Sequence, residues 1–109
     1  MAIQDLIHEE ALLNDTIYQL KKLILEETIK QDIFESNIWL NTDFKEKGLT
    51  NDSQRKAFVK TQMKDYISKV GMLKNDLALA ENELSLCKTK IKVCIELGID
   101  FDDKPTTEE

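Results

Sequence analysis

The sequence has little of what interrupts a helix, with one Pro and three Gly in 109 residues. It also has few aromatic side chains, at 6%, and a single His, whereas 33% of its residues are charged. This composition is unlike that of a sheet protein or a disordered segment, and the length corresponds to one domain. We therefore expect a helix-rich interaction protein.

Long apolar runs and a basic leader are missing as well. The first residues, MAIQDLIHEEALL, place no Lys or Arg before an apolar stretch. No apolar run approaches the roughly 18 residues that a membrane-spanning helix needs. We expect no signal peptide, no membrane partner and a cytoplasmic location.

Residues that support catalysis or metal binding are scarce. Cys87 and Cys94 are seven positions apart, about 10 Å along a helix, whereas a disulfide requires Cα atoms within about 7 Å. His8 is distant in sequence, and neighbouring Glu pairs such as Glu26–Glu27 point in different directions on a helix. We expect two reduced thiols, no metal, no cofactor and no enzymatic activity.

The strongest pattern is a row of eleven small and apolar side chains in the second half of the chain, spaced alternately four and three residues apart. This 3.5-residue period is typical of a left-handed coiled coil. We call the row the seam and expect it to mediate oligomerisation. Gly98 is expected to end the helix. The seam consists of Val59, Met63, Tyr66, Val70, Leu73, Leu77, Ala80, Leu84, Cys87, Ile91 and Cys94.

The first forty residues are also predicted to be helical, but their apolar pattern is less regular. One stripe comprises Leu6, Leu13, Ile17, Leu20 and Ile24. We expect it to continue, after a phase shift near Glu26–Glu27, through Leu25, Ile29, Ile33 and Leu40, with Phe34 and Ile38. Such a wide apolar face suggests packing against more than one neighbour.

Between these helices the stretch IWLNTDFKEKGLTNDSQR, residues 38–55, lacks helical periodicity. Gly48 is suited to a positive φ, Thr50 or Asn51 to a helix N-cap, and Asp52 to a first turn. The sequence thus predicts a helix at 3–41, a turn at 42–50 and a helix at 51–97. The expected fold is an all-α, long antiparallel helical hairpin of coiled-coil type, which dimerises into a four-helix bundle or an extended coiled coil.

The stretch 38–55 contains a Trp, a Phe and an Arg, which a turn does not require. These residues have two interpretations. Large aromatic side chains and Arg recur at binding hot spots, which makes the turn a candidate partner-binding site. Alternatively, the aromatic side chains cover the end of the bundle, while the charged residues form only a cap and a weak surface ion pair. The candidate residues are Trp39, Thr42, Asp43, Phe44, Asn51 and Arg55.

Charge is unevenly distributed along the chain, whose net charge is −6. After Arg55 comes a basic strip, opposed only by Asp65, which suits nucleic-acid phosphates or forms a solvated face. The strip consists of Lys56, Lys60, Lys64, Lys69 and Lys74. The acidic remainder also permits a nucleic-acid mimic.

The last residues, 98–109, form an acidic segment with a Pro-containing polar end. We expect this segment to be mostly disordered. Ile99 and Phe101 stand among Asp residues, so they either dock into a basic groove on a partner or fold back onto the bundle.

The segment ESNIWLNTDFKEKGLTNDSQRKAFV, followed by a long Leu/Lys/Glu helix, resembles small coiled-coil proteins from the early recombination and replication region of phages and prophages of Gram-positive bacteria. The matching residues are Trp39, Leu40, Thr42, Asp43, Gly48, Leu49, Thr50, Asn51, Arg55 and Ala57. They cover about a quarter of the chain. The resemblance implies a setting in the host cytoplasm rather than a reaction.

Three functions remain open on these grounds. The first is a non-catalytic assembly protein that binds itself and an unidentified phage or host protein of DNA metabolism. The second is an acidic inhibitor that mimics nucleic acid against a host nuclease or defence complex. The third is single-stranded nucleic-acid binding through the basic strip.

Overall fold

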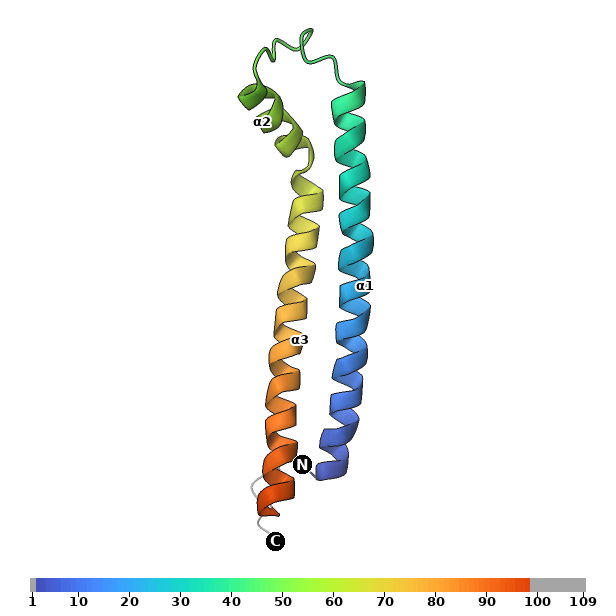
Figure 1. The fold of residues 1–109 in the computed structure, drawn as a ribbon, viewed down its shortest axis with the longest axis vertical. Coiled ribbons are helices and arrows are strands. Elements are labelled where there is room, and N and C mark those ends of the chain that lie inside the picture. The colour runs from blue at the N-terminus through green and yellow to red at the C-terminus, as the bar shows by residue number, and fades with distance from the viewer. Residues whose placement is uncertain (1, 99–109) are drawn as a thin grey trace. The chain divides into compact units, whose positions relative to one another are not determined.

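The computed structural model describes residues 2–98 and contains three α-helices in that range, α1 (Ile3–Asn41), α2 (Asp52–Gln62) and α3 (Lys64–Leu97) (Figure 1). No strand occurs among these residues, so the all-α class is confirmed. The prediction of a disordered acidic tail, with Ile99 and Phe101 in it, falls outside the described residues.

The chain divides into two compact units, which we describe separately. The turn unit is Lys22–Asn75 and contains the second half of α1, the loop, α2 and the start of α3. The terminal unit combines Met1–Lys21 with Asp76–Glu109, and its described part is the start of α1 and the end of α3.

The turn unit is a helical hairpin whose core lies where the loop meets the helices. Phe44, Val59 and Met63 are buried there. Partly buried apolar side chains from α1, the loop and α2 pack around them, namely Phe34, Ile38, Leu49 and Phe58. The loop is therefore held by a core of its own.

The terminal unit has a small core in which α1 meets the end of α3. Leu6, Cys87 and Cys94 are buried, with Ile3, Leu13 and Ile91 against them. The Cys87 Sγ donates a hydrogen bond of 3.2 Å to the carbonyl oxygen of Leu6, and burial raises the pKa of the Cys87 thiol. Both cysteines are free thiols that serve as small packing residues.

The seam is covered within this one chain. In the turn unit Val59, Met63 and Val70 are buried and Tyr66 and Leu73 are half-buried. In the terminal unit the buried seam residues are Ala80, Cys87 and Cys94, and the half-buried ones are Leu77, Leu84 and Ile91. Because α1 supplies the facing side chains of both cores, a second chain is not required to cover the seam.

The single helix predicted over residues 51–97 is wrong at Met63, where α2 ends and α3 begins. The axis bends there (Figure 1), and the Met63 N–H is shared between the carbonyls of Val59 at 3.0 Å and Lys60 at 3.2 Å. Thr61 also bonds through its hydroxyl to the carbonyl of Ala57 at 3.0 Å, a contact that often bends helices. The bend keeps Met63, only 2% exposed, inside the turn-unit core.

The predicted phase shift in the first helix is also wrong. The half-buried or buried positions continue from Ile24 through Glu27, Gln31, Phe34 and Ile38 without changing register. The other predicted row is exposed instead, and we call it the outer stripe: Leu25, Ile29, Ile33 and Leu40.

Candidate functional site

The loop of the turn unit, residues 42–51, is shaped by short-range hydrogen bonds. Gly48 has a φ of 75°, which a residue with a Cβ rarely adopts. Asn51 caps α2, because its side chain accepts from the Gln54 N–H at 2.9 Å, while the Gln54 side chain accepts from the Thr50 N–H at 2.9 Å. This reciprocal pair satisfies two backbone donors at the start of α2. The predicted roles of Gly48 and Asn51 are thus observed.

Phe44 is the centre of an aromatic cluster in the loop. Its ring centroid lies 5.2 Å from that of Trp39 and 6.1 Å from that of Phe58. Phe44 is 9% exposed, whereas Trp39 is 37% exposed. Phe44 is therefore a core residue, and Trp39 keeps part of its surface available.

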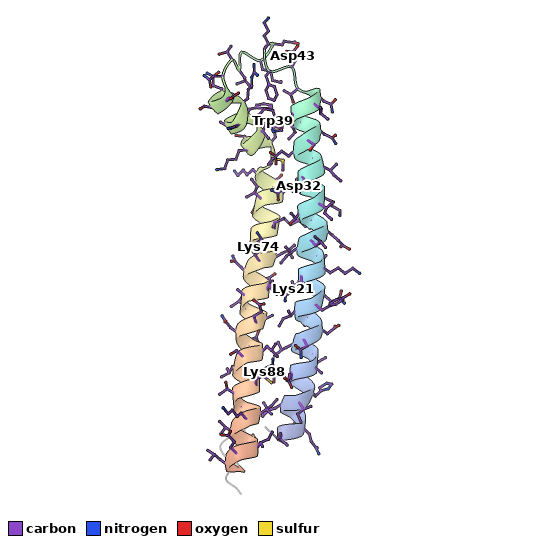
Figure 2. All side chains as sticks on the ribbon, viewed as in Figure 1. Lys21, Asp32, Trp39, Asp43, Lys74 and Lys88 are labelled. Atoms are coloured by element: carbon purple, nitrogen blue, oxygen red, sulfur yellow. The ribbon has the colours of Figure 1, made fainter. Side chains whose placement is uncertain are left out.

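Arg55 and Asp43 both form contacts within the loop. The Arg55 guanidinium lies 5.6 Å from the centre of the Phe44 ring, and its Nε donates to the Leu49 carbonyl at 3.0 Å. Asp43, labelled in the loop in Figure 2, accepts from the Glu46 N–H at 3.0 Å. Through these contacts Arg55 ties the loop to α2, and the role of Arg55 and Asp43 in partner binding stays a prediction. Thr42 is half-buried and donates its N–H to Ile38.

Three hollows adjoin one another around Ile67 of α3, which is 43% exposed. The first, of about 240 Å³, lies against Trp39, Lys56 and Lys60. The second, of about 670 Å³, is lined by Lys60, Thr61 and Lys64, next to the bend. The third, of about 300 Å³, reaches Lys74. Since Ile67 lines all three, we treat them as one surface and call it the Ile67 groove.

The groove divides the predicted basic strip. Lys56, Lys60, Lys64 and Lys74 all line it. Lys69 does not, because two positions from Ile67 on a helix is almost the opposite face. It forms an ion pair with Glu27 at 3.2 Å instead. Four of the five predicted lysines are therefore brought together.

Glu27 lies in the inward-facing row of α1, a feature that the sequence interpretation missed. It is 6% exposed and pairs with Lys69 and, at 3.3 Å, with Lys30. The hydrogen bond from Lys69 lowers the pKa of Glu27, and burial raises it. Because the hydrogen bond from Lys30 lowers it as well, the pKa of Glu27 stays below its ordinary value. Ile24, Glu27, Gln31 and Phe34 follow one another at spacings of three, four and three residues. This spacing was sufficient to identify Glu27 as an inward-facing residue.

Within residues 2–98, no three His, Cys, Asp or Glu side chains lie close enough to hold a metal ion. The helices in this range are each too polar or too short to traverse a bilayer.

No protein-family model, curated protein or solved structure matches the chain.

Proposed function

We propose that the chain is a non-catalytic interaction protein that self-associates through the outer stripe of α1. The observation that carries this proposal is the exposure of Leu25 (61%), Ile29 (49%), Ile33 (57%) and Leu40 (80%). Their spacings of four, four and seven residues place them on one face of the helix. Aliphatic side chains clustered in this way typically mark an interaction surface.

A second copy of the chain suits the outer stripe because the stripe is self-complementary. In an antiparallel pair centred on Ile29, Leu25 of one copy lies level with Ile33 of the other. An isologous arrangement of this kind is the commonest route to a homodimer.

The test combines light scattering with paired substitutions. Ile29→Lys with Ile33→Lys is expected to yield a monomer with unchanged helicity, because both side chains are already half-exposed in the single chain. The matched control, Met72→Lys with Leu79→Lys, changes two similarly exposed apolar residues on α3 and should leave the dimer intact. A parent protein that is monomeric at high micromolar concentration would refute self-association.

For the setting, we propose a phage accessory role in the host cytoplasm, with a partner in phage or host DNA metabolism. What supports it is the resemblance of residues 35–59, which include Trp39, Gly48 and Arg55, to early-region phage proteins. The phage assignment does not depend on the proposed self-association.

A further inference from the structure

We propose that the Ile67 groove binds an acidic amphipathic helix of a partner protein. The proposal does not depend on self-association, because the groove lies on the α2–α3 bend and shares no residue with the outer stripe. It is an interaction surface of its own within the turn unit.

The shape of the groove matches a helix. Its lining includes aliphatic side chains, with Ile67 at the centre, the largely buried Val59 and Met63 on one side and Ala57 on the other, next to polar residues such as Gln31 and Thr61. Ile67 remains 43% exposed although it is a large aliphatic residue. A row of apolar side chains at positions i, i+4 and i+7 of a helix fills a surface of this kind.

The charge of the rim identifies an acidic partner. Lys56, Lys60, Lys64 and Lys74 surround the floor, and Glu35 is the one carboxylate that lines any of the three hollows. Four cations against one anion favour a ligand with Glu or Asp on both sides of its apolar face. The bend at Met63 creates this surface, because it separates the lysines of α2 from those of α3 around Ile67.

A protein ligand fits better than single-stranded nucleic acid. Bases bind without sequence preference by stacking on exposed aromatic rings. Trp39 is the one aromatic side chain lining the groove, and it already packs against Phe44 at 5.2 Å. The apolar part of the lining is otherwise aliphatic, which suits leucine-like side chains.

The test measures binding of three fluorescent probes by anisotropy. One is a synthetic helical peptide with Leu at i, i+3, i+4 and i+7 and Glu on both flanks, one is the same peptide with Lys in place of Glu, and one is a dT oligonucleotide. We expect saturable, salt-sensitive binding of the Glu peptide and none of the Lys peptide. Tighter binding of the oligonucleotide, or no saturable binding of the Glu peptide, would overturn the proposal.

Two charge-reversed variants locate the site. Lys60→Glu with Lys64→Glu is expected to weaken binding of the Glu peptide at least about tenfold, equivalent to roughly 1.4 kcal/mol. Lys88→Glu with Lys90→Glu makes the same change of net charge in the terminal unit and should weaken binding less than about threefold, since exposed charges beyond a Debye length are screened. Equal losses in the two variants would show a net-charge effect and reject the groove.

Discussion

Replacing Phe44 by Ala is expected to lower the stability of the turn unit by about 3–5 kcal/mol, the usual cost of removing a buried Phe. The side chain is 9% exposed and contacts the rings of Trp39 and Phe58 and the Arg55 guanidinium. All of these contacts are lost together when the Phe44 ring is removed. Urea denaturation followed by the fluorescence of Trp39, the single Trp, measures the effect within this unit.

The control is Lys45→Ala, an exposed neighbour in the same loop. It should change the free energy of unfolding by less than about 0.5 kcal/mol. A loss of under about 1 kcal/mol for Phe44→Ala would mean that the aromatic cluster does not hold the loop, and that Phe44 is free to serve as a binding residue.

Replacing Leu6 by Asp is expected to unfold the terminal unit locally. Leu6 is 1% exposed and packs against Cys87 and Cys94. A carboxylate at this position is buried without a partner, which costs about 3–5 kcal/mol. The measurement is the rate at which a thiol reagent labels Cys87, which is buried and bonded to the Leu6 carbonyl in the parent. We expect labelling at least about a hundredfold faster, the equivalent of roughly 2.7 kcal/mol.

Ile7→Asp provides a closely matched comparison. It introduces the same charge one residue later, at a side chain that is 51% exposed. Labelling of Cys87 in this variant should stay within about threefold of the parent, because exposed substitutions cost little. Equal acceleration by both substitutions would show that the described core of the terminal unit does not protect the thiol.

Local sequence signals were sufficient for much of the fold. The 3.5-residue period located the seam. Gly48 marked the loop and Gly98 marked the end of α3, and both residues have a positive φ, of 75° and 64°. Asn51 was one of two residues proposed as the cap. Each of these depends on a residue and its near neighbours, so the sequence carries the information directly.

The candidate site was less predictable, because it depends on the bend and on packing between elements. Val59, Met63 and Tyr66 keep the seam spacing across the bend, so periodicity predicted one straight helix. Ile67, next to Tyr66, carried no pattern of its own and became central only because α2 and α3 diverge beside it.

Two further errors have the same origin. Glu27 interrupts the apolar row of α1, and at this buried position it forms an ion pair with Lys69. The sequence does not show that Lys69 pairs with Glu27, so the apolar Leu25, Ile29 and Ile33 were predicted to continue the core. These three residues are exposed. Arg55 likewise looked free for binding because its acceptor, the Leu49 carbonyl, is a backbone atom that no side-chain pattern reveals.

The central claim is that the seam pairs within one chain and leaves the outer stripe free for self-association. Isotope-filtered NOE spectroscopy tests it on a dimer prepared by mixing ¹³C-labelled and unlabelled protein. Contacts between the methyl groups of Leu6 and Ile91, which belong to one core cluster, should appear in the uniformly labelled sample and be absent from the filtered spectrum, whereas contacts between Leu25 and Ile33 should appear in the filtered spectrum. A filtered contact between Leu6 and Ile91 would show that the seam joins two chains and would contradict the account.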